Sequence, residues 1–419
     1  MNTLKRDLKI ALLLGGPGSE REVSLVSGNS VYDALCRAGF TDVTKVDVHG
    51  PDFRLPEGTE LAYNIIHGTF GEDGTLQAIL EERGVPYTGA GSRSSALCFN
   101  KSESKKVFLE AGVPTPHAEI LDCSHGIVMP SLPLPFVIKP PCEGSSVGVH
   151  IVRRQEDVLP AMEEAVTHGT TVLVEEFIQG KELTVGILDG KALPVIHICP
   201  RSGFYDLSNK YPWMNMGGGT DYICPADLPE ETAANVQEAA LKAYKAAGVE
   251  VYGRVDVLLR EEDGAPFVLE INTIPGMTPS SLLPKAAAAS GWPYEDLCEK
   301  IAELSLVTPV NNVIFDRGRG VAPPAPPDVA QSHNASPPFR QKAGNASSGT
   351  GGQKRDHRTQ GQKLPFLALP AQAVPHCHRL RAYFRLNRGY RFSLERLHPQ
   401  IRLAFHRHRH PEKQRHFQL

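Results

Sequence analysis

The stretch RVDVLLREEDGAPFVLEINTIPGMTPSSL, residues 254–282, decides how this chain folds. Residues 254–259 and 267–273 alternate polar and apolar side chains with the period of half-buried strands. The turn-forming residues 261–264 separate the two runs. Residues 272–281 are too rich in Pro, Gly and hydroxyls to continue a strand. The sequence therefore predicts a β-hairpin followed by a sharp loop.

Four polar side chains share one face of this predicted hairpin. Folding the chain symmetrically about Asp263 places Asp256 opposite Glu270 and Arg254 opposite Asn272, because side chains alternate between faces with a period of two. The other face is expected to pack on a core. Its residues are Val255, Val257, Leu259, Phe267, Leu269 and Ile271.

The polar face has the composition of a magnesium site. Two carboxylates and a carboxamide oxygen suit Mg²⁺, which prefers carboxylates together with substrate phosphates. Arg254 could then meet an anion bound to that metal. A solvated face carrying a neutral charge pair would show the same pattern, so the hairpin alone leaves both interpretations open.

The charge distribution divides the chain into a body and a tail. The 419 residues suggest about two to three domains. Residues 310–419 hold 19 Lys and Arg against 5 Asp and Glu, whereas the first 309 residues hold 25 against 42. The tail is rich in Pro, Gly and Ser, then in Arg and His. It is interpreted as a disordered extension or an out-of-frame translation, with a basic arm for nucleic acid or anionic surfaces as the alternative.

The eight cysteines are dispersed and form no C-x-x-C pair, which favours reduced thiols in a cytoplasmic protein. The apolar run at residues 8–14 is too short for a signal peptide. No run approaches the roughly 20 apolar residues of a membrane span. We therefore expect a cytoplasmic protein without a membrane segment.

Residues 8–99 alternate strands and helices, typical of a Rossmann-like layer. A buried strand at 9–14, a turn at 15–20 and a helix at 21–39 begin it. The turn, G-G-P-G, lacks the G-x-G-x-x-G pattern, so a dinucleotide site is disfavoured. Glu20 beside the turn could hold an ammonium group, or it could only interact with the helix dipole.

Polar and glycine-rich loops follow several later strands. His67 begins a loop at the predicted carboxyl edge of the sheet, where it could bind a ligand or simply pack. Lys139 precedes the small-residue loop 143–148, which could cover phosphates or be a flexible turn. The strand beginning at Thr171 leads into a plausible adenosine clamp, and the loop 203–222 has the composition of a lid.

Six motifs occur together in this order. They are E-R-E-V-S-L at 20–25, H-G-T-F-G-E-D-G at 67–74, K-P at 139–140 with E-G-S-S-V-G at 143–148, F-Y-D with K-Y within 204–211, G-R-V-D at 253–256, and L-E-I-N-T-I-P-G-M at 269–277. Over residues 8 to about 307 the chain resembles the D-alanine–D-alanine ligases of the ATP-grasp superfamily.

The resemblance implies an α/β (α+β) chain with the three-domain ATP-grasp fold. It places an N-terminal Rossmann-like substrate domain at 1–99, a central ATP-grasp subdomain at 100–182, and a C-terminal ATP-grasp subdomain with the metal and substrate site at 183–309. The tail at 310–419 lies outside it.

The resemblance also implies an ATP-dependent ligase that joins two D-alanines through an acylphosphate, for peptidoglycan synthesis. ATP and two Mg²⁺ or Mn²⁺ ions would be needed, and a homodimer is expected. Lys210 and Tyr211 in the lid favour this enzyme over a relative that accepts D-lactate. A non-catalytic protein binding nucleotides, or nucleic acid through the tail, is the alternative from another class.

The family's functional residues transfer to matching positions. The metal ligands would be Asp256, Glu270 and Asn272. The ATP-binding residues would be Lys101, Lys139, Ser146, Glu175, Glu176, Phe177, Ile178, Glu182, Phe204 and Lys210. The substrate-binding and catalytic residues would be Glu20, His67, Ser145, Tyr211, Arg254, Gly276, Ser281 and Leu282.

These residues would have distinct roles. Glu20, assisted by His67, would bind the ammonium group of the first D-alanine. The second carboxylate and the developing oxyanion would be bound by Arg254, the amide of Gly276, Ser281 and Leu282. Tyr211 would close the lid, linked through Ser145 to Glu20.

Overall fold

The computed structural model describes residues 4–144, 147–201 and 219–308, together with four short strands between 382 and 417. The chain divides into two compact units, residues 1–327 and 328–419, which are described separately. Five predicted site residues lie outside the described ones. They are Ser145, Ser146, Phe204, Lys210 and Tyr211.

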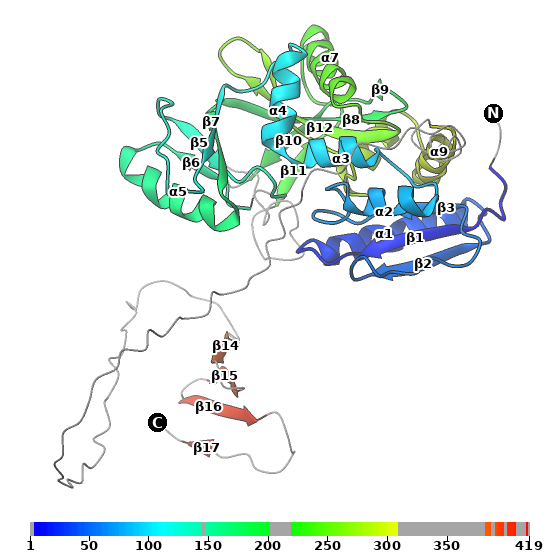
Figure 1. The fold of residues 1–419 in the computed structure, drawn as a ribbon, viewed down its shortest axis with the longest axis horizontal. Coiled ribbons are helices and arrows are strands. Elements are labelled where there is room, and N and C mark those ends of the chain that lie inside the picture. Colours follow the sequence, from blue (N-terminus) through cyan, green and yellow to red (C-terminus); the bar gives the residue numbers. More distant parts are fainter. Residues whose placement is uncertain are drawn as a thin grey trace, which may run out of the picture. The chain divides into compact units, whose positions relative to one another are not determined.

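The N-terminal layer is a parallel sheet in the order β2 (Val43–Val48), β1 (Ile10–Gly15), β3 (Leu61–Asn64). Every residue of β1 is buried, as the continuous apolar run predicts. Alternate residues of β1 enter different cores, one shared with α1 (Arg21–Arg37) and one with α2 (Thr75–Arg83). The predicted Rossmann-like layer is thus present, with helices packed on both faces (Figure 1).

The central layer is an antiparallel sheet that two helices precede in the chain. Its strand order is β4 (Ala118–Asp122), β7 (Thr171–Glu176), β5 (Phe136–Lys139) and β6 (His150–Val152). Helix α5 (Val158–Ala165) buries Val158, Ala161, Met162 and Ala165 in the core of this sheet. Two helices lead into the layer, α3 (Ser92–Phe99) and α4 (Lys101–Glu110).

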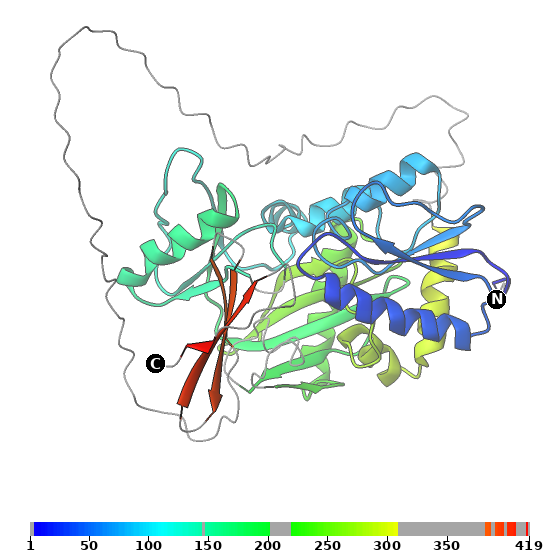
Figure 2. The ribbon, with the colours of Figure 1, turned by 90° about the horizontal axis from the view of Figure 1, so that it is seen from below.

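The largest sheet carries the predicted hairpin. Its order is β11 (Thr220–Ile223), β10 (Ile196–Pro200), β8 (Gly180–Leu188), β12 (Tyr252–Arg260) and β13 (Pro266–Asn272), with β9 (Lys191–Ala192) paired to β8. Helices α7 (Glu230–Ala246), α8 (Leu282–Ala289) and α9 (Tyr294–Val307) complete the unit. Figure 2 shows this sheet, in green, between the blue N-terminal layer and the teal central layer.

The predicted hairpin register is correct at its functional end and wrong beyond it. Arg254 pairs with Asn272 and Asp256 with Glu270, as the symmetrical folding requires. The register then shifts, and Val257 pairs with Val268. Because a bulge adds one residue to a strand, the faces exchange past that point. Val268 is buried, whereas Phe267 and Leu269, which we expected in the core, are only half-buried.

The C-terminal unit contains four antiparallel strands in sequence order. They are β14 (Ala382–Leu386), β15 (Tyr390–Leu397), β16 (Gln400–Arg407) and β17 (His416–Phe417). The sequence, interpreted as disordered or out of frame over 310–419, did not predict these strands. The rest of that segment lies outside the described residues.

Candidate active site

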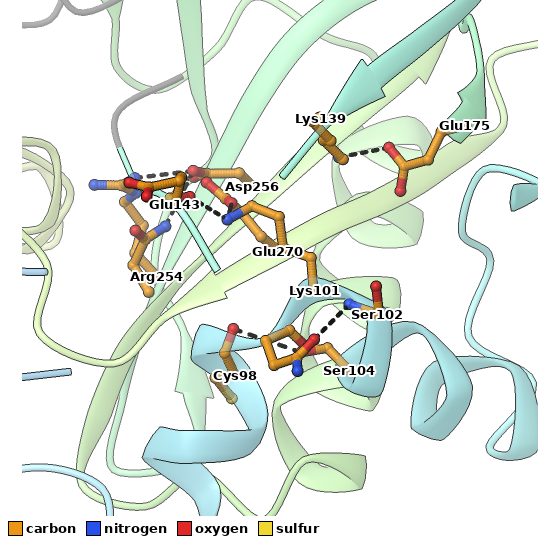
Figure 3. A network of polar contacts seen from close by, with 12 residues as sticks. Cys98, Lys101, Ser102, Ser104, Lys139, Glu143, Glu175, Arg254, Asp256 and Glu270 are labelled. Atoms are coloured by element: carbon orange, nitrogen blue, oxygen red, sulfur yellow. Dashed lines mark hydrogen bonds and ion pairs between the residues drawn. The ribbon is translucent and has the colours of Figure 1, made fainter. Parts of the chain in front are cut away.

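Asp256 is a buried carboxylate held by three side chains. Strand β12 lies between β8 and β13, so Asp256 is opposite both Thr184 and Glu270. Its Oδ1 accepts hydrogen bonds from Thr184 Oγ1 at 2.6 Å and from Arg254 Nε at 2.9 Å. Its Oδ2 accepts from Arg254 Nη2 at 2.9 Å and from Asn272 Nδ2 at 3.1 Å. The carboxylate therefore has a fixed position on the sheet (Figure 3).

Glu270 and Lys101 form an ion pair beside Asp256. Lys101 Nζ lies 3.0 Å from Glu270 Oε2 and donates to the carbonyl of Glu143 at 2.7 Å. Burial lowers the pKa of Lys101, but the charge and hydrogen bond of Glu270, with smaller contributions from Cys142 and Glu175, together outweigh that effect and leave the pKa above its ordinary value. Lys101 is thus a charged lysine that joins α4 to β13 and to the glycine-rich loop.

A pocket opens where these elements meet. Its walls come from β13 and the loop after it, from the α3–α4 junction, and from the glycine-rich loop. They are formed by Glu72, Cys98, Phe99, Lys101, Glu143, Gly144, Glu270, Ile271, Asn272 and Thr273. Residues assigned from the sequence to metal binding and to phosphate binding therefore line one cavity.

The donor set of this cavity fits magnesium. Asp256 and Glu270 offer carboxylate oxygens, and Asn272 offers a carboxamide oxygen. Among the described residues, no group of three or more His, Cys, Asp and Glu side chains could hold a metal ion. A metal here would need further oxygen ligands from water or a bound nucleotide, and Mg²⁺ is the ion that binds in this way.

A buried carboxylate lies between two lysines at the end of the central sheet. Glu175 Oε2 is 2.5 Å from Lys139 Nζ, and Glu175 Oε1 is 2.8 Å from Lys105 Nζ. Burial raises the pKa of Glu175, but the two ammonium groups outweigh it and hold the pKa below its usual value. Sequence reasoning named Lys139 and Glu175 but missed Lys105, because a lysine in a basic helix normally indicates a solvated face.

The predicted nucleoside residues lie at the end of β7, directly after it, and near the start of β8. The Glu176 carboxylate accepts from the amide of His117 at 2.8 Å, and Ile178 is buried. The Arg153 guanidinium lies 4.6 Å from the centre of the Phe177 ring. Glu182, near the start of β8, pairs with Leu258. The four residues therefore come together at the β7–β8 junction, with Arg153 as a neighbour that the sequence did not predict.

The Glu20 carboxylate lies between two glycine-rich loops. Glu20 is the residue before α1, yet its side chain makes no capping hydrogen bond. A Cβ built on Gly68 would stand 2.5 Å from Glu20 Oε2, and one on Gly144 would stand 3.1 Å from the same atom. This carboxylate therefore occupies the junction of the N-terminal and central layers, at the start of α1.

His67 is buried against the loop that follows the hairpin. Its Nδ1 lies 2.8 Å from the carbonyl of Ile274, and its Nε2 lies 3.1 Å from Ser27 Oγ. Burial lowers the pKa of His67, but Glu72, Glu20 and the Ile274 carbonyl outweigh it and raise the pKa above its ordinary value. Glu72, at 3.8 Å from His67, was missed, although the H-G-T-F-G-E-D-G run contains it.

The loop after β13 brings together three further predicted residues. Ser281 Oγ accepts from the Thr278 amide at 3.1 Å and lies 2.7 Å from Thr278 Oγ1. A Cβ on Gly276 would be only 3.1 Å from Ser281 Oγ, so the missing side chain lets the hydroxyl approach the backbone. Leu282 is buried and begins α8.

Comparisons with known proteins agree with this geometry. Residues 118–303 match a family model described as the D-ala D-ala ligase C-terminus. The D-alanine--D-alanine ligase of Methylacidiphilum infernorum is 46% identical over 296 residues, which are 71% of this chain and 95% of that protein. The corresponding ligase of Syntrophotalea carbinolica is 42% identical over 296 residues, 70% and 94% of the two chains.

Solved structures give the same result. A D-alanine--D-alanine ligase from Bacillus anthracis complexed with ATP has a TM-score of 0.62 and 32% identity, covering 73% of this chain and 99% of that one. VanG D-Ala:D-Ser ligase from Enterococcus faecalis has a TM-score of 0.61 and 28% identity, covering 71% and 99%. This chain belongs to the D-alanine–D-alanine ligase family.

Proposed function

We propose that this chain is an ATP-dependent ligase that joins two D-alanines into D-alanyl-D-alanine, releasing ADP and phosphate, for peptidoglycan precursor synthesis. The observation that carries the proposal is the single cavity in which Lys101, Glu270 and Asn272 meet, beside the Arg254–Asp256 pair. A non-catalytic nucleotide-binding protein would have no need of these groups together with the carboxylate of Glu20.

The reaction consists of two substitutions. The carboxylate of the first D-alanine attacks the γ-phosphorus of ATP, the bond to the β-phosphate oxygen breaks, and ADP leaves. The free amine of the second D-alanine then attacks the acylphosphate carbonyl, phosphate leaves, and the amine gives up a proton. Magnesium ions bound at Asp256, Glu270 and Asn272 would offset the charge of the phosphates.

The chain's own residues position the reactants. We assign Lys101 and Lys139 to the phosphates, because their ammonium groups lie at the two polar clusters of the site. Glu20 holds the ammonium group of the first D-alanine near Gly68 and Gly144. Arg254, paired with Asp256 in this structure, binds the second carboxylate and the oxyanion.

Activity is tested by phosphate release from ATP and magnesium with candidate acceptors. We expect release with D-alanine, little release with L-alanine, and D-alanyl-D-alanine as the product identified by mass spectrometry. D-lactate and D-serine, each supplied with D-alanine, test the two related ligase types. The absence of any release stimulated by D-alanine would contradict the proposed function.

The proposal includes a homodimer in the cytoplasm, the assembly and location that the resemblance implies. Within the described residues no helix is long and apolar enough to cross a membrane. Sedimentation of the purified chain tests the dimer.

The tail is expected to be dispensable for catalysis. The comparisons align about seven-tenths of the chain, and the active-site residues described above all lie between Glu20 and Leu282. Deleting residues 310–419 should therefore leave turnover and the KM values for ATP and D-alanine close to those of the full chain. A folded, soluble truncated protein with no ligase activity would contradict this expectation.

A further inference from the structure

Lys105 is a buried lysine that the proposed mechanism does not use. It lies in α4 and is only 3% exposed. Its ammonium group donates to Thr115 Oγ1 at 2.7 Å and to the carbonyl of Pro116 at 2.7 Å, and it lies 2.8 Å from Glu175 Oε1. These two hydrogen bonds and the ion pair surround the ammonium group with groups of the protein. We therefore assign Lys105 no contact with a substrate.

Two of these acceptors, Glu175 and Thr115, also contact residues on opposite sides of the proposed nucleotide site. Glu175 holds the ammonium of Lys139 with its other oxygen, at 2.5 Å (Figure 3). Thr115 Oγ1 donates to the carbonyl of Val268 at 2.8 Å, and the Val268 amide donates to Pro114 at 2.8 Å. Val268 is two residues before Glu270 on β13. A chain of polar contacts therefore runs from the metal-binding strand to the phosphate-binding lysine.

The charges of Lys105, Glu175 and Lys139 do not cancel. Two buried ammonium groups share one buried carboxylate, so the group of Lys105, Glu175 and Lys139 has a formal charge of +1 when both lysines are protonated. Burial lowers the pKa of Lys105, and the charge of Glu175 opposes that effect. In a site of low polarity such a charge acts strongly on a nearby phosphate. Without Lys105, Glu175 and Lys139 would be a neutral pair, and Lys139 would attract phosphate less.

We propose that Lys105 is a positioning residue for ATP. Lys105 holds Glu175 in place relative to β13, and its charge leaves Lys139 with net positive charge to bind the phosphates. The proposal rests on the proposed function only in taking ATP as the substrate. It assigns no contact between Lys105 and the nucleotide. A lysine that merely stabilised α4 would instead affect both substrates alike.

The test is Lys105→Met in the full chain, which keeps the length of the side chain and removes its charge. We expect the Kd of Mg·ADP, measured by calorimetry, and the KM for ATP to rise about tenfold or more, the usual effect of losing hydrogen bonds to a charged group. The KM for D-alanine at saturating ATP should stay close to wild type.

Lys106→Met is the matched control. Lys106 is the next residue of α4, is exposed, and pairs only with Glu103 at 2.7 Å in the described contacts. Its replacement should change neither nucleotide affinity nor the KM for D-alanine. Thermal denaturation of both variants shows whether each is folded.

Two further variants separate positioning from folding. Thr115→Val keeps the shape of the side chain but breaks the link between Lys105 and Val268, so it should weaken Mg·ADP binding less than Lys105→Met does. In a Glu175→Gln background, Lys105→Met should have little additional effect, because both changes act through the same carboxylate.

Several outcomes would overturn the proposal. They are a folded Lys105→Met variant with wild-type Mg·ADP affinity, equal rises in both KM values, and full additivity with Glu175→Gln. If Lys105→Met does not fold, unchanged affinity in Thr115→Val overturns it. A wild-type chain that binds Mg·ADP but forms no dipeptide would refute the proposed function alone, since the affinity measurements need no turnover.

Discussion

Replacing Glu270 by Gln should lower turnover by about a thousandfold or more, because a metal contribution of several kcal/mol depends on this carboxylate. A carboxamide offers one neutral oxygen where we assign a carboxylate shared by two magnesium ions. The change also leaves Lys101, whose raised pKa depends on Glu270, without its nearest countercharge. Steady-state turnover at saturating ATP, magnesium and D-alanine measures the effect.

Metal binding provides a second readout for the same variant. The affinity for Mn²⁺ in the presence of ADP, followed by electron paramagnetic resonance, should fall together with turnover. Glu262→Gln is the control, because Glu262 is exposed in the turn of the same hairpin. Near-wild-type turnover with unchanged Mn²⁺ affinity in Glu270→Gln would remove this residue from the metal site.

Arg254→Ala should lower turnover by at least about a hundredfold, since one donor to a developing oxyanion contributes roughly 2.7–4 kcal/mol to the barrier. Arg254 also makes two of the hydrogen bonds that hold Asp256, leaving Thr184 and Asn272 as the other donors. The variant therefore tests the oxyanion role most clearly when its Mn²⁺ affinity is measured as well.

Matched replacements sharpen the test of Arg254. Arg254→Lys keeps the charge but not the two-pronged geometry, so it should restore only part of the activity. Arg260→Ala, on the same strand, removes an arginine that pairs with Asp263 near the turn and should leave turnover unchanged. Wild-type turnover in Arg254→Ala would exclude this side chain from the mechanism.

The sequence was sufficient for the elements with a regular pattern. The run at residues 9–14 predicted β1, and the alternation around Asp263 predicted which residues face one another at the metal-binding end of the hairpin. The glycine-rich loop and Glu20 were named separately from the sequence, and the structure brings them together at Gly144. Local patterns and the family resemblance therefore named residues that the fold places close together.

The remaining features depend on contacts between distant segments. Helix α5 was not predicted, although Val158, Ala161, Met162 and Ala165 recur with helical spacing. Strand β4 has only five residues and was not predicted either. Lys105 became identifiable only when β7 and the loop at 114–116 were packed against α4. The shift in strand register after Asp256 was not predicted, because no residue type in this stretch marks the bulge that causes it.

That bulge separates the hairpin into two halves with different constraints. On one side, Arg254 and Asp256 keep the pairing that orients the metal ligands. On the other side, Leu258 pairs with Glu182 of β8, and Val268 bonds the segment that holds Lys105. Both halves of the hairpin are therefore tied to the site, and residues 262–264, which are exposed at the turn, are where we expect an inserted tag to cost catalysis least.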